Sequence, residues 1–133
     1  MNDLTFTATL ALSYDDAVQG VRDAFANEGF GILTEIDVAK VMKAKLDVDL
    51  PRQIILGACR PQLAYAALQA NPSVGALLPC NVVVRESADA VIVEAVDPAR
   101  MLGIAIDDPS LADLAHDATA RVQRAMEALK SLR

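Results

Sequence analysis

Several features are missing from this chain of 133 residues, and each absence excludes a class of protein. Tryptophan is absent and aromatic residues make up 4% of the sequence, so the core must be built mainly from aliphatic side chains. No apolar run approaches the roughly 18 residues that a membrane-spanning helix needs. The first residues lack the basic and continuously apolar regions of a secretory signal peptide. We therefore expect a cytoplasmic protein with no membrane partner.

Residues that hold metals or form disulfide frameworks are equally scarce. Two cysteines, Cys59 and Cys80, are too few for a disulfide framework, and they do not form the CxxC pair typical of structural zinc sites. The single histidine, His116, has no HExxH partner, and the glycines do not form a phosphate-binding loop. We expect His116 to lie at the surface, and we predict no metal ion and no cofactor.

The charge balance excludes another class of partner. The chain carries 12 Lys and Arg residues against 18 Asp and Glu residues, which gives a formal net charge of −6. Nucleic acids and anionic membranes both require clustered cations, so neither is expected as a partner. Hydrophobic residues make up 53% of the sequence, which excludes general disorder. The length fits one domain over residues 1–133.

Hydrophobic periodicity predicts alternating strands and helices. Residues 4–12 alternate strictly between apolar and polar side chains, which predicts a strand with one buried face. Ser13 and Asp108 are each placed to cap the helix that follows, and Gly29 to end the first helix. Further strands are predicted over residues 30–36, 53–58, 82–84 and 90–96, the last two as a hairpin, and helices after Ser13, over residues 37–46 and 61–69, and from Pro109 onward.

The order β-α-β-α-β-α-β-β-α predicts an α+β domain of two layers, with helices on one face of a mixed sheet. The strand over residues 53–58 is apolar on both faces, which is typical of a central strand. The other face of the sheet then needs a cover. A homodimer, or a ligand pocket beneath the last helix, would provide one.

One junction combines features that suit a reactive thiol. Cys59 follows a buried strand that ends through Gly57, and it precedes a helix that begins at Pro61. Unpaired amides at a helix N-terminus favour a thiolate, and Arg60 adds a positive charge. The helix terminus alone contributes roughly 0.3–1 kcal/mol, which is less than one pKa unit. A thiolate at neutral pH would therefore need Arg60 or another cation.

Cys80 directly precedes the fourth predicted strand. If that strand is the antiparallel neighbour of the strand before Cys59, the two sulfurs lie at the same edge of the sheet. Two interpretations stay open, because free cysteines are most often small buried hydrophobic residues. The pair is either part of the core or a functional site.

Three blocks of the sequence resemble the family called domain of unknown function 302. The blocks are residues 29–37, residues 55–61 with Ala64, Tyr65, Ala67 and Leu68, and residues 78–85, followed by Asp97 and Pro98. The resemblance covers residues 29–98. One departure is Arg60, which stands where the family is expected to have asparagine, and this argues against a family-wide role for Arg60.

The resemblance implies an architecture more than an activity. Members are small bacterial and archaeal proteins with a two-layer α+β fold similar to the TATA-binding-protein-like class, and they tend to be dimers. No established activity comes with the family. Because its motifs are centred on Cys59 and Cys80, the resemblance implies that these residues form a common site.

Three functions are compatible with these patterns. The first is a binding module for a small anion, a thiol or another sulfur species. The second is a thiol-dependent redox or transfer enzyme in which Cys80 resolves Cys59. The third is a dimeric structural protein without a catalytic site. No catalytic group is evident beyond the two cysteines. The candidate ligand-binding residues are Cys59, Cys80, Arg60, Pro61 and Gln62, with Glu35, Tyr65 and Asn81 as further candidates for the wall.

Overall fold

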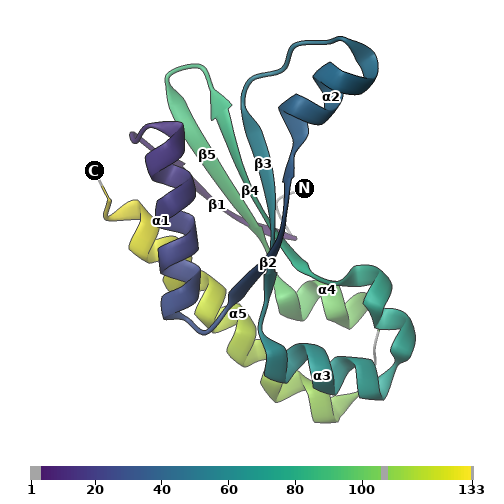
Figure 1. The fold of residues 1–133 in the computed structure, drawn as a ribbon. Coiled ribbons are helices and arrows are strands. Elements are labelled where there is room, and N and C mark those ends of the chain that lie inside the picture. The colour runs from purple at the N-terminus through teal and green to yellow at the C-terminus, as the bar shows by residue number, and fades with distance from the viewer. Residues whose placement is uncertain (1–3, 106–107, 133) are drawn as a thin grey trace.

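The computed structural model describes residues 4–105 and 108–132 (Figure 1). Strands and helices alternate through most of the chain, and a short 3-10 helix, η1, precedes the fourth strand. The strands are β1 (Thr5–Leu10), β2 (Gly31–Asp37), β3 (Gln53–Cys59), β4 (Cys80–Ser87) and β5 (Ala90–Val96), and the helices are α1 (Tyr14–Asn27), α2 (Val38–Leu46), α3 (Pro61–Ala70), η1 (Pro72–Leu77), α4 (Pro98–Ala105) and α5 (Pro109–Lys130).

The strands form one five-stranded sheet in the order β1-β5-β4-β3-β2. This confirms the α+β class and the interior position of β3. Every neighbouring pair is antiparallel, so the expectation of a mixed sheet was wrong. Parallel neighbours need a connection that crosses a face of the sheet. Helices α2 and α3 instead lie near the ends of the strands, where the chain reverses direction (Figure 1).

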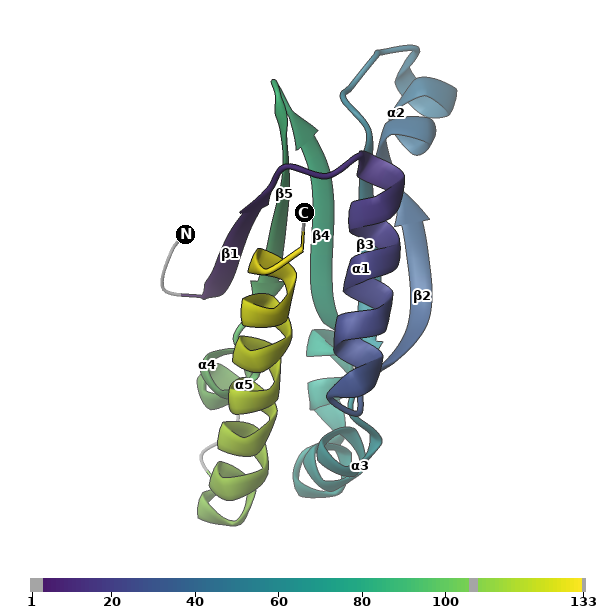
Figure 2. The ribbon, with the colours of Figure 1, turned by 90° about the vertical axis from the view of Figure 1, so that its left-hand side faces the viewer.

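Helices α1 and α5 lie side by side over one face of the sheet, as Figure 2 shows. The buried stripe of α1, which includes Val21 and Phe25, meets the inward residues of the strands, such as Val84 and Val93. The ring of Phe25 contacts Phe30 edge to face, with 5.6 Å between ring centroids. The core is therefore mainly aliphatic, as the composition predicts, with this aromatic pair near one end.

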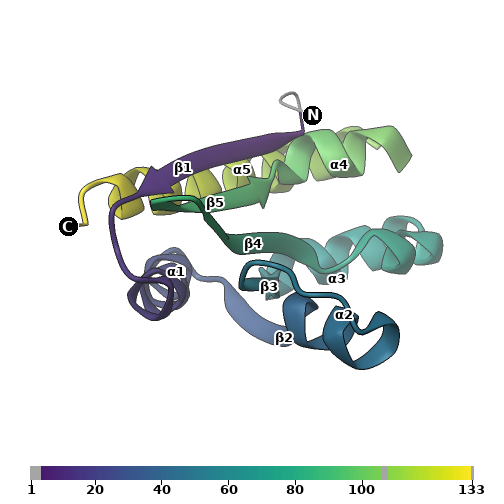
Figure 3. The ribbon, with the colours of Figure 1, turned by 90° about the horizontal axis from the view of Figure 1, so that it is seen from above.

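The opposite face of the sheet carries no such helical layer. Helix α2 has no buried residue and projects beyond the end of the strands in Figure 1. Seen from above, it lies next to β2 and β3 (Figure 3). Large apolar side chains are exposed on β2 and around α2, among them Ile36, Leu46 and Leu50. The homodimer expected from the sequence, which would cover the second face of the sheet, stays a prediction. No helix in the described part of the chain is long and apolar enough to cross a membrane.

Helix capping follows the sequence closely, with one omission. The amide of Asp16 donates to Ser13 Oγ, and the amide of Ser110 donates to Asp108 Oδ1, so both predicted caps are confirmed. Gly29 has a φ of 85°, which suits its predicted position at the end of α1. Helix α4 was not predicted. Its first turn is held by Asp97, whose carboxylate accepts hydrogen bonds from the Ala99 amide and the Thr119 hydroxyl.

Candidate functional site

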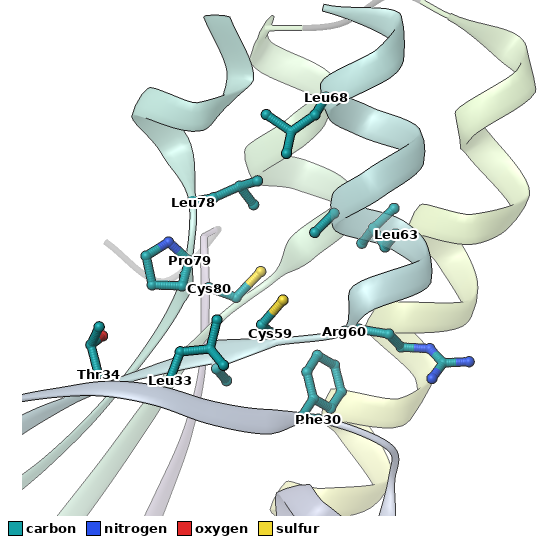
Figure 4. Close-up of a pocket in the computed structure, with 12 residues that line it drawn as sticks. Phe30, Leu33, Thr34, Cys59, Arg60, Leu63, Leu68, Leu78, Pro79 and Cys80 are labelled. Carbon is teal, nitrogen blue, oxygen red and sulfur yellow. The ribbon is translucent and has the colours of Figure 1, made fainter. Parts of the chain in front are cut away.

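A pocket of about 300 Å³ opens at one end of the sheet (Figure 4). It lies between β2, the junction of β3 with α3, and the residues that lead into β4. Apart from the two cysteines, only Thr34 and Arg60 bring polar side chains to its wall. The lining residues are Phe30, Leu33, Thr34, Ala58, Cys59, Arg60, Leu63, Ala64, Leu68, Leu78, Pro79 and Cys80.

The two cysteines meet in this pocket. Strands β3 and β4 are antiparallel neighbours, and their register pairs Ala58 with Cys80. Cys59 is therefore the next residue along β3 from the partner of Cys80, and Figure 4 shows the two sulfurs side by side. Both cysteines are free thiols. The condition set by the sequence, that adjacent antiparallel strands bring both sulfurs to one sheet edge, is satisfied.

Gly57 lets two residues of the pocket wall, Thr34 and Pro79, pack directly against the backbone of β3. A Cβ atom at this position would overlap Thr34 Oγ1 and would lie 2.6 Å from Pro79 Cγ. Strand β2 changes register between Ile32 and Thr34, opposite this part of β3. Only glycine lets the hydroxyl of Thr34 and the ring of Pro79 approach the backbone this closely. The glycine before the first cysteine therefore sets the position of two lining residues.

Arg60 contributes to the wall, but its charge lies elsewhere. Its guanidinium points away from the two sulfurs (Figure 4) and forms an ion pair with Asp117 on α5, with 3.5 Å between Nε and Oδ2. The Arg60 side chain is only 14% exposed. Hydrogen bonding from Arg121 lowers the pKa of Asp117, and Arg60 lowers it further. The charge of Arg60 is therefore paired with Asp117. The expectation that this charge would favour a Cys59 thiolate was wrong.

A helix N-terminus was predicted to lower the pKa of Cys59, but burial raises the pKa of both thiols. It raises the pKa of Cys59 above the ordinary value of 9.0. The pKa of Cys80 is raised to about 11, first by burial and then by the neighbouring Cys59. Both groups are therefore neutral thiols at pH 7. The pocket presents soft, uncharged sulfur atoms and no activated nucleophile.

The other candidate residues on α3 lie outside the pocket lining. Pro61 begins the helix, as predicted, and Gln62 follows it; both side chains are exposed. Tyr65 is 66% exposed, and its hydroxyl accepts a hydrogen bond from Gln69 Nε2. These side chains occupy the solvent side of α3, whereas Leu63 lies on the side that faces the core and the pocket.

Two further candidates on the strands are also placed elsewhere. Glu35 pairs with Arg22 of α1 and lines a separate polar groove. Asn81 is exposed on β4, where its register partner is Gly57. Alternation along a strand explains the position of Asn81, because it points to the face opposite that of Cys80. The structure thus brings together Cys59, Arg60 and Cys80 of the predicted set.

Comparison with known proteins identifies the family. The model of the family described as Domain of unknown function DUF302 matches residues 6–129. The chain belongs to the DUF302 family. The match extends on both sides of the segment 29–98 that carried the resemblance, and it includes α1 and most of β1 and α5.

A solved DUF302 structure has the same fold. The crystal structure of an uncharacterised conserved DUF302 protein from Bacillus stearothermophilus matches with a TM-score of 0.83 and 25% sequence identity. The alignment covers 95% of this chain and 98% of that one. None of the curated proteins compared with this DUF302 chain matches it.

The sequence analysis did not predict that the apolar residues of this DUF302 pocket belong to a site. Leu63, Ala64 and Leu68 recur at helical spacing, which predicts an ordinary core as readily as a pocket wall. Leu63 is buried, whereas Leu68 is 40% exposed. Leu33 is 66% exposed beside the register shift in β2. Its role in the wall depends on this irregularity, and strict alternation does not predict where one occurs.

The raised thiol pKa values lead to a direct prediction for alkylation. At pH 8, iodoacetamide should modify Cys59 more slowly than a cysteine of the unfolded chain, and Cys80 should stay unmodified for longer still. Because only the thiolate reacts, the Cys59 rate should continue to increase above pH 9, and Cys80 should react near pH 11 while the fold persists. Mass spectrometry of each peptide measures both rates. The protein in guanidinium chloride is the control, and half-maximal Cys59 reactivity below pH 8 would contradict the prediction.

Proposed function

We propose that this DUF302 domain is a binding module for a small ligand and that the pocket around Cys59 and Cys80 is its site. One observation carries the proposal: two free thiols converge on an open pocket whose other walls are almost entirely apolar. Ligand sites are typically concave and apolar with a few polar groups that fix orientation. Here the sulfur atoms would be those groups.

The lining favours an uncharged or soft ligand over an anion. The one cationic side chain in the wall, Arg60, is directed toward Asp117 and away from the sulfurs. An anion in the pocket would lose its hydration and gain no opposite charge, which is costly. Of the ligand classes considered from the sequence, a thiol or another sulfur species therefore has more support than an anion.

The redox alternative has less support, although the two sulfurs lie side by side (Figure 4). Thiol–disulfide exchange begins with attack by a thiolate, and the pKa values of both cysteines are raised. Among the described residues, the pocket lining includes no imidazole or carboxylate to accept a proton. A passive binding site fits neutral thiols better than a catalytic one.

Nile red, a neutral dye whose fluorescence rises in apolar surroundings, tests whether this pocket binds ligands. We expect saturable binding to the wild-type chain and at least about 10-fold weaker binding to Ala64→Phe, a loss near 1.4 kcal/mol. Ala64 lines the pocket, and the larger ring would fill it. Ala70→Phe is the matched control, because Ala70 is exposed on the same helix and outside the lining. Equal affinities for the two variants would contradict the proposal.

A further inference from the structure

We propose that the paired sulfurs of Cys59 and Cys80 bind one Cu(I) ion. The inference rests on the proposed function, because it places a specific ligand in the same pocket. The two thiols come from neighbouring antiparallel strands and lie side by side at one edge of the sheet (Figure 4). Neither is part of a disulfide. Two sulfur ligands on opposite sides of one metal ion are a complete coordination shell for Cu(I).

The composition of the site argues for Cu(I) over other metals. Soft thiolates select Cu(I), whereas carboxylate and carbonyl oxygens suit Mg²⁺, Ca²⁺ and Mn²⁺. Structural Zn²⁺ takes four protein ligands. In the part of the chain that the structure describes, no group of three or more His, Cys, Asp or Glu side chains could hold a metal. A pair of sulfurs therefore meets the requirement of a two-coordinate ion and falls short for a tetrahedral one.

The apolar wall would also retain copper in its reduced state. Cu(II) prefers tetragonal sites of nitrogen and oxygen ligands, and this pocket supplies none from imidazole or carboxylate side chains. Side chains such as Phe30, Leu63 and Leu78 limit the access of water to the sulfurs. A mainly apolar environment with two sulfur ligands favours the monovalent ion.

Binding exchanges two protons for one copper ion. Two S–H bonds break, two Cu–S bonds form, and both protons pass to solvent, so no electron is transferred. The two thiolates and the Cu(I) ion leave a net charge of −1 in the pocket. The two Cu–S bonds offset the cost of this buried charge, whereas a free anion in the pocket would form no such bonds. Cys59 is half-buried, which provides a route for the ion and for the released protons.

The test is an anaerobic titration of the reduced chain with Cu(I) supplied as its bicinchoninate complex. The expected result is one tightly bound ion per chain, accompanied by ultraviolet thiolate-to-copper absorption and the release of two protons. Cys59→Ser should weaken binding by more than the roughly 100-fold that loss of a supporting residue costs at a metal site. His116→Ala is the matched control, because His116 is exposed on α5 outside this pocket, and its affinity should equal that of the wild type.

The outcomes separate this inference from the proposed function. If Cys80→Ser fails to fold because Cys80 is buried, Cys80→Ala provides the second ligand variant, and circular dichroism checks both. Unchanged Cu(I) affinity in Cys59→Ser, or equal stoichiometric binding of Zn²⁺, would overturn the copper proposal. Absence of Cu(I) binding together with Nile red binding that Ala64→Phe abolishes would overturn copper and leave the pocket function standing. Absence of both would overturn both.

Discussion

Replacement of Phe25 by alanine is expected to lower the free energy of unfolding by about 3–5 kcal/mol, the usual cost of truncating a fully buried aromatic side chain. Phe25 is 0% exposed on the inner face of α1. Its ring also contacts Phe30 edge to face, an arrangement that adds about 0.5–1.5 kcal/mol beyond the area it buries. Urea denaturation followed by circular dichroism measures the change.

The same variant links the core to the pocket. Phe30 belongs to both, since it packs against Phe25 and lines the site. Removing Phe25 should therefore weaken Nile red binding as well as stability. Tyr65→Ala is the control, because it removes an exposed aromatic ring from α3, and it should change stability by less than about 0.5 kcal/mol. A loss below 1 kcal/mol in Phe25→Ala would contradict the complete burial of this ring in the core.

The two aspartate–proline pairs near the C-terminus show how far sequence patterns can predict structure. Asp108 was recognised as a helix cap because a long apolar stripe follows Pro109. Asp97 precedes Pro98 in the same way, yet it was interpreted only as the end of a strand. Helix α4 is eight residues long, so its hydrophobic period is too short to stand out. Its cap depends partly on Thr119 of α5, a tertiary contact that the local sequence does not show.

In the candidate site, too, features that depend on local sequence could be predicted, and features that depend on tertiary contacts could not. The meeting of Cys59 and Cys80 could be stated only as a condition, because local patterns predict where strands end but not which strands pair. The direction of the Arg60 side chain could not, because its partner, Asp117, lies on the last helix. With the cation paired elsewhere, burial is the largest influence on both thiols.

Replacement of Gly57 by alanine is expected to lower the free energy of unfolding by about 3 kcal/mol, at the upper end of the usual cost of overpacking. The added Cβ would overlap Thr34 Oγ1 and lie 2.6 Å from Pro79 Cγ. The ring of Pro79 has little freedom to move aside. Because both neighbours line the pocket, Cu(I) and Nile red affinities should fall together with stability. Thermal and urea denaturation measure the first effect.

A second substitution separates the two contacts. Thr34→Ala removes the overlapping hydroxyl and leaves the Pro79 ring, so in the Gly57→Ala background it should restore part of the lost stability. Contacting residues commonly show coupling free energies of about 0.5–3 kcal/mol, and this pair should fall in that range. Gly103→Ala is the control, because a Cβ there meets no heavy atom of the described residues within 4 Å beyond its chain neighbours and its own helix backbone, and alanine in a helix is favoured by up to about 1 kcal/mol. Equal stabilities for Gly57→Ala and Gly103→Ala would show that the glycine before Cys59 is not what allows the wall of the cysteine pocket to close.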